Sequence, residues 1–132
     1  MTINKDLHNQ VSVGVAIALT AVADGEDVVG AVIDRQGSEG LELIFQVGAY
    51  TDGDVTPLIE ESDDNVTYTA VADANLTNTE ASAALSAAGV SNIGYVGFKR
   101  YVRATAVTAA GSTLSVGASF VKFSLRLQGT VN

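Results

Sequence analysis

VIDRQGSEGLELIFQVGAYTDGDVTPLIEESDD, the segment from Val32 to Asp64, contains two alternating apolar segments separated by tight turn signals. Between residues 41 and 49 every odd-numbered position is apolar, whereas Glu42 and Gln46 point the other way, as in a strand with one buried face. The turn at 52–54, Asp-Gly-Asp, precedes a second strand. The pattern predicts an antiparallel β-meander that forms a rigid sheet and supplies no obvious reactive group.

The segment before this one, Val11 to Ala23, also has a period of two. Its odd-numbered positions are all apolar, and its even-numbered positions are mostly small. A face of Ala and Gly suits either a covered sheet or the close approach of a neighbouring subunit, and the sequence leaves both open. Asp24-Gly25, which follows, predicts a hairpin turn.

Two irregularities are expected in the remaining strands. The last long strand begins at Thr113, and its apolar positions change from even to odd numbers at Phe120-Val121. A shift of one residue inverts the faces of a strand, so we expect a β-bulge or a crossing to the partner sheet there. Pro57, the single proline, should lie at an edge or a bulge because it cannot donate to a ladder.

One short helix or helical turn is predicted near residues 79–88. Thr77 to Glu80 has capping-box spacing, an Ala-rich run follows, and Gly89 is placed as a C-terminal stop. Such a short helix should pack on the sheet through Leu76 and Leu85, and an ordered loop is the alternative. The sequence therefore predicts an all-β protein, a jelly-roll-like antiparallel β-sandwich forming a single domain over residues 1–132 with extended terminal segments.

Composition excludes several classes of function. The chain has 132 residues, of which 47% are hydrophobic and only 6% aromatic, so the core is expected to consist mainly of Val, Ala, Leu and Ile. A formal net charge of −8 disfavours contact with nucleic acid or an anionic membrane. There is no Cys, which removes disulfides and thiolate chemistry. We find neither a secretory signal nor an apolar run long enough to span a bilayer.

No catalytic or cofactor-binding residues are predicted. His8 is the only histidine, and no nucleophile or orienting acid stands at a recognisable spacing from it. Gly94 and Gly97 precede Lys99 without the spacing of a phosphate-binding loop.

The acidic residues allow two interpretations. Asp52, Asp54, Asp63 and Asp64 are hard oxygen ligands of the kind that calcium prefers, although their spacing does not match an EF-hand. Turn chemistry and a solvated strand end account for the same residues, and we expect no metal site.

Lys99, Arg100 and Arg103, with Tyr95 and Tyr101, form the only basic and aromatic cluster in the sequence. One interpretation is intramolecular pairing with acids on neighbouring strands, namely Glu42, Glu60 or Glu61. The other is an interface in which Arg and Tyr anchor an acidic partner surface, since both residue types are enriched at the centres of contacts.

Several of these segments together resemble a group of small virion structural proteins of tailed bacteriophages and prophages. The similarity covers about residues 6 to 110. The segments that carry it are Gly37 to Leu43, Asp52-Gly53-Asp54, Leu58 to Asp64, Val71 to Leu76, Gly94 to Gly97 and Lys99 to Arg103.

The resemblance implies a non-enzymatic capsid decoration (cement) protein that binds and stabilises the head shell. Its partners would be the major capsid protein and further copies of itself, as a trimer, with neither nucleic acid nor membrane. The protein would be made in the host cytoplasm and reside on the capsid exterior. Alternatives are a tail or head-to-tail connector component, and a calcium-dependent carbohydrate-binding jelly roll. The expected interface residues are Val13, Val15, Ile17, Lys99, Arg100, Tyr101, Arg103, Val121, Phe123 and Leu125.

Overall fold

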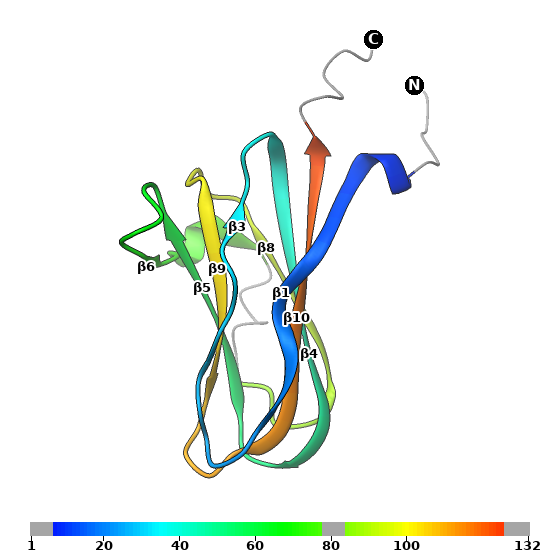
Figure 1. The fold of residues 1–132 in the computed structure, drawn as a ribbon, viewed down its shortest axis with the longest axis vertical. Helices are drawn as coiled ribbons and strands as arrows, with labels where there is room; N and C mark the ends of the chain where they lie inside the picture. The colour runs from blue at the N-terminus through cyan, green and yellow to red at the C-terminus, as the bar shows by residue number, and fades with distance from the viewer. Residues whose placement is uncertain (1–6, 78–83, 126–132) are drawn as a thin grey trace.

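A computed structural model describes residues 7–77 and 84–125 of the chain as two packed antiparallel sheets (Figure 1). The two short 3-10 helices are η1 (Leu7–Gln10) and η2 (Asp73–Asn75). The strands are β1 (Val11–Val22), β2 (Val28–Val29), β3 (Ile33–Asp34), β4 (Ser38–Asp52), β5 (Val55–Ser62), β6 (Thr69–Ala70), β7 (Leu76–Thr77), β8 (Gly89–Tyr95), β9 (Tyr101–Thr108) and β10 (Thr113–Leu125).

The strand order is that of a jelly roll. One sheet, here called the β4–β10 sheet, has the order β1-β10-β4-β8-β7. The other, the β5–β9 sheet, has the order β2-β9-β5-β6, and β3 also pairs with β9. Early strands pair with late ones in a nested series: β1 with β10, β2 and β3 with β9, β4 with β8, and β5 with β6. The predicted jelly-roll-like β-sandwich is confirmed.

The predicted meander is wrong, although its strands and turns are present. β4 and β5 follow one another through the turn at Gly53, whose φ is +98°, but they belong to different sheets. Asp24 and Gly25 likewise have positive φ, and they connect β1 to β2 across the sandwich instead of forming a hairpin. Each turn reverses the chain as expected, whereas burial of the apolar faces of both sheets decides which layer the next strand joins.

The predicted single apolar face of the first strand is also interrupted. The pairing of β1 with β10 shifts register between Val15 and Ile17, and again between Ile17 and Thr20. As a result Val13 and Val15 are exposed, whereas Ile17 is buried in the core. A bulge adds one residue and so inverts the faces on its two sides.

β10 shows neither the bulge nor the crossing expected at Phe120-Val121. Its register with β1 and β4 is continuous through both residues, and the strand stays in one sheet to Leu125. Val116 and Ala118 are buried and Phe120 packs against the core, whereas Val121 and Phe123 lie on the opposite face. The change in the apolar pattern therefore marks a strand with apolar residues on both faces.

The core lies between the sheets and is built from the inward face of each. Leu43, Phe45 and Val47 of β4 are fully or almost fully buried, as the alternation predicted. Ala104 and Ala106 of β9 face them from the other layer and are fully buried. Small residues on one sheet against large ones on the other allow close packing with few aromatic side chains.

Two smaller predictions have different outcomes. Pro57 pairs with Ala106 of β9, and on its other side β6 reaches only Glu60 and Glu61 of β5, so the proline lies at an edge as expected.

Of the predicted helix at 79–88, residues 78–83 lie outside the described residues, and 84–88 contain no helix. Leu85 instead forms a β-bridge with Val55, while Leu76 and Leu85 pack against the core.

Candidate functional site

An exposed apolar surface covers the outer side of the β4–β10 sheet. Val13 and Val15 are 65% and 62% exposed, and Leu19 is 74% exposed. The register places Val13 beside Val121, and Val11 beside Phe123. We call this surface the outer apolar face, and it comprises Val11, Val13, Val15, Leu19, Ile44, Val121 and Phe123.

The outer apolar face is almost free of charge. Paired residues of β1, β10, β4 and β8 form rows that run across the sheet. Among the side chains of these rows that point to the outer side of the sheet, Glu42 is the one that is charged. Glu42 is itself hydrogen-bonded to the amide of Asn92. Phe123 lies over Gly40, where a Cβ would overlap its ring. The chain as a whole has a net charge of −8. Because this side is nearly uncharged, another negatively charged surface can approach it at low electrostatic cost.

The structure separates the expected interface residues into three groups. Val13, Val15, Val121 and Phe123 lie on the outer apolar face, and the backbone of Leu125 pairs with Ser38 at the end of the same sheet. Ile17 is 2% exposed and packs in the core, so it is not a surface residue. The basic and aromatic residues lie apart from this face, around the start of β9.

The basic cluster is paired within the chain. Arg103 donates to Glu60 at 3.0 Å and stacks on the ring of Tyr68, which confirms one of the predicted partners. Lys99 and Arg100 pair with acids that the sequence did not indicate. Lys99 binds Asp63, and Arg100 binds Asp34 through two hydrogen bonds. The hydrogen bond from Arg100 lowers the pKa of Asp34 to about 2.

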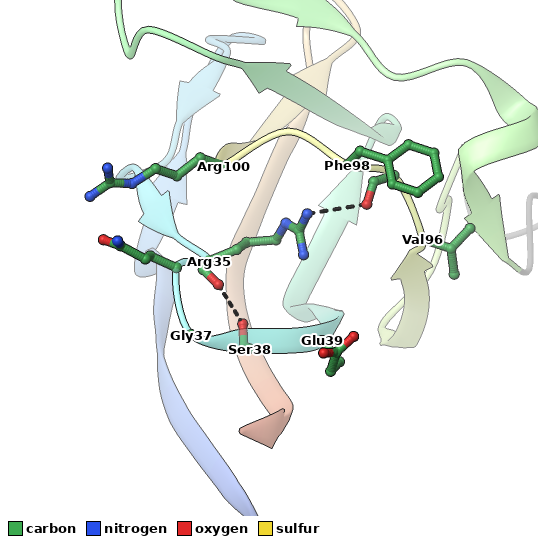
Figure 2. Close-up of a pocket in the computed structure, with 9 residues that line it drawn as sticks. Arg35, Gly37, Ser38, Glu39, Val96, Phe98 and Arg100 are labelled. Atoms are coloured by element: carbon green, nitrogen blue, oxygen red, sulfur yellow. Dashed lines mark hydrogen bonds between the residues drawn. The ribbon is translucent and has the colours of Figure 1, made fainter. Parts of the chain in front are cut away.

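Arg35 occupies a more unusual position, between two loops that the sequence keeps far apart. It follows β3, and its side chain extends between the loop that carries Phe98 and the start of β4 (Figure 2). Its Nε donates to the carbonyl of Lys99 at 2.9 Å, and its Nη2 donates to the carbonyl of Gly97 at 3.1 Å. The residue is only 9% exposed, and its guanidinium lies 4.8 Å from the centre of the Tyr95 ring.

Tyr95 supports both Arg35 and the loop. Its hydroxyl donates to Oε1 of Glu61 at 2.7 Å and accepts the N–H of Lys99 at 3.1 Å. Burial of the phenol, with the nearby Glu61 carboxylate, raises the pKa of Tyr95 to about 12. The hydroxyl therefore stays protonated at neutral pH and holds the 96–99 loop against the β5–β9 sheet.

We expect the stability of the protein to fall at alkaline pH through this tyrosine. Because the pKa of folded Tyr95 lies above its ordinary value of 10.0, the folded state retains a proton that the unfolded state has lost. The stabilisation is complete below pH 10 and is lost as the pH rises to about 12. Urea unfolding at about pH 8, 10 and 11.5 should show a steeper loss for the wild type than for Tyr95→Phe. Parallel pH profiles would contradict this assignment.

A pocket of about 650 Å³ opens beside Arg35. Its lining includes Ser38 and Glu39 from β4, and Val96 and Phe98 from the loop before β9. Phe98 is 91% exposed and Val96 is 52% exposed, so one side of the rim is apolar, while Glu39 and Arg100 also line the pocket and Arg35 lies within it. Sequence reasoning missed this site, because no motif spacing connects Arg35 with Val96 and Phe98, which lie far from it in the sequence.

The acidic residues do not converge on a metal site. Asp52 and Asp54 precede β5, whereas Asp63 and Asp64 follow it, so the eight-residue strand separates the two pairs. Oδ1 of Asp64 accepts the backbone N–H groups of Val66 and Thr67, which lowers the pKa of its carboxyl. No group of three or more metal-ligating side chains occurs within residues 7–77 and 84–125. The four aspartates therefore form two separate pairs at opposite ends of β5.

Comparisons with known proteins identify no family for this chain. No family model matches the chain, and no curated protein matches it. Among solved structures, a chain from Bacillus endospore appendages, described as a novel family of disulfide-linked pili, is 13% identical. The alignment covers 88% of this chain and 89% of that one, with a TM-score of 0.48. The present sequence has no Cys and so cannot form disulfides. No helix in the described part of the chain has the length and apolarity to span a bilayer.

Proposed function

We propose that this protein is a non-enzymatic structural component of a bacteriophage virion, and specifically a capsid decoration protein. The observation that carries the proposal is the outer apolar face, an exposed and nearly uncharged surface on an otherwise acidic jelly roll. Exposed apolar patches on such a body are typical of surfaces that contact other proteins. The resemblance of several sequence segments to small phage virion proteins is the reason for proposing a phage particle.

The physical requirements of decoration agree with this architecture. A protein that reinforces a shell bridges neighbouring subunits, so it needs a stiff body and several contacts more than it needs a reaction centre. Two layers with a closely packed core supply the stiffness. Repetition of the chain around a threefold axis would give each copy a contact through Val13, Val15 and Val121, and would place the acidic turns toward solvent.

Replacing Val13 and Val15 together by Lys should weaken self-association and shell binding while leaving the fold intact. Both side chains are more than half exposed, so their replacement should change stability by only about 0.5 kcal/mol each. A charge at each position would have to be desolvated in the contact, which should weaken association at least about tenfold. Sedimentation velocity measures self-association, and co-sedimentation with undecorated heads measures shell binding.

The matched control replaces Val29 and Val66 by Lys, which introduces the same charge at two exposed valines away from this face. This variant should assemble and bind as the wild type does. Shell binding by Val13→Lys/Val15→Lys at wild-type affinity would contradict the proposed surface. Truncation after Phe120 is a poorer test, because it removes residues of β10 that pair with both β1 and β4.

The number of copies in a particle tests the role itself. A reconstruction of a virion that contains this chain should show it at hundreds of positions on the outer surface of the head. A dozen copies or fewer, in a ring at one vertex, would identify a connector or tail component instead.

A further inference from the structure

Arg35 is a buried cation that the described residues do not neutralise. The three ion pairs of residues 7–77 and 84–125 involve Lys99, Arg100 and Arg103, and none involves Arg35. Its two hydrogen bonds are accepted by neutral backbone carbonyls. Glu39 on the same rim has an interaction partner of its own. A largely buried cation without a counter-ion favours the binding of an external anionic group.

The unused edge of the guanidinium faces the pocket. Arginine has five N–H donors, and the carbonyls of Lys99 and Gly97 accept from Nε and Nη2. In the described part of the chain, no fully buried side-chain nitrogen or oxygen lacks a hydrogen-bond partner. Any free N–H group of Arg35 is therefore accessible from the pocket, into which the side chain points between the 96–98 loop and Ser38 (Figure 2).

An apolar rim adjoins this cation. Phe98 extends from the loop with almost its whole ring exposed, and Val96 lies on the same rim. A second pocket of about 380 Å³ shares Glu39 and Val96 with the first and continues to Phe123. The two pockets together form an elongated groove that has Arg35 and Arg100 at one end and Glu42 at the other, and it is longer than a small anion needs.

We propose that this groove binds a segment of a partner protein in which a carboxylate lies next to a large apolar side chain. The guanidinium of Arg35 would receive the carboxylate through charge-assisted hydrogen bonds, for which its planar fork is suited. Phe98 and Val96 would cover the neighbouring apolar side chain. The two backbone carbonyls and the Tyr95 ring already hold the guanidinium in place, so little conformational entropy is lost on binding. The groove adjoins the outer apolar face at Phe123, but it does not include Val13 or Val15 and its proposed ligand does not depend on their contact.

The test uses a short peptide and nuclear magnetic resonance. The probe is acetyl-Gly-Leu-Asp-Leu-Gly-amide, and its uncharged counterpart has Asn in place of Asp. Measurements at about 0.15 M salt screen the repulsion from the net charge of the protein. The Asp peptide should bind with a Kd near about 1 mM, shift the signals of Val96, Phe98 and the Arg35 Nε–H, and bind at least about fivefold more tightly than the Asn peptide.

Two variants and a small anion complete the experiment. Phe98→Ala should weaken the Asp peptide at least about threefold without loss of fold, whereas Val66→Ala, at another exposed site, should have no effect. Sodium acetate should bind at least about tenfold more weakly than the peptide. Equal binding of the Asp and Asn peptides, acetate binding as tight as the peptide, or no shifts at about 5 mM peptide would each overturn the proposal.

Discussion

Phe45→Ala is expected to lower the free energy of unfolding by about 3–5 kcal/mol, the usual cost of removing a buried aromatic side chain and leaving a cavity. Phe45 is fully buried at the centre of β4, where it faces the second sheet. With aromatic residues at only 6% of the chain, few large side chains are available to fill the space. A domain of this size has a total stability of about 5–15 kcal/mol, so the variant should lose a substantial fraction of it.

Phe98→Ala is the matched control, because it makes the same chemical change at a residue that is 91% exposed. We expect this variant to stay within about 0.5 kcal/mol of the wild type. Urea unfolding followed by circular dichroism measures both. A similar loss for the two variants would mean that the centre of the sandwich does not lie at Phe45.

Gly30→Ala is expected to destabilise the protein by about 3 kcal/mol through overpacking against backbone. Gly30 lies between β2 and β3, where its N–H donates to the carbonyl of Ala104 at 2.7 Å and the next N–H donates to that of Ala16 at 2.9 Å. A Cβ at Gly30 would overlap the carbonyl oxygen of Ala16 and lie 2.6 Å from that of Ala104. Because these oxygens belong to β1 and β9, the clash would separate the two sheets at this side.

Gly89→Ala provides the comparison, since a Cβ there meets no heavy atom within 4 Å. This variant should unfold within about 0.5 kcal/mol of the wild type. The amide N–H of Ala31 donates to the carbonyl of Ala16 in β1. Hydrogen exchange at Ala31 should therefore accelerate in Gly30→Ala and stay unchanged in Gly89→Ala. Unchanged exchange at Ala31 in Gly30→Ala would contradict the proposed clash.

Local patterns predicted the parts of the fold that depend on near neighbours. The alternation of Leu43, Phe45 and Val47 gave the correct inward face, because one register holds along that part of β4. The same reasoning failed for Val13, Val15 and Ile17, where bulges change the register within one strand. A bulge depends on how the partner strand fits, and the β1 sequence alone carries no sign of it.

The candidate sites were predictable to different degrees. Four of the outer-face residues, Val13, Val15, Val121 and Phe123, were expected to meet a partner, and they lie together on one exposed surface. The groove at Arg35 was not foreseen. Its components come from the loop after β3 and the loop before β9. Arg35 is 64 and 62 positions from Lys99 and Gly97, the two residues whose carbonyls it binds. No motif spacing connects segments so distant.

The amino-acid sequence by itself determined that this chain forms antiparallel strands, where the turns at Asp24-Gly25 and Gly53 fall, and that its core consists mainly of aliphatic residues. These features follow from period-two alternation and from the backbone freedom of Gly and Asp, which act over a few residues. Only the tertiary structure decided which sheet each strand joins, which valines remain exposed, and where Arg35 is buried. Those outcomes depend on burying two apolar faces at once, and that requirement involves the whole chain.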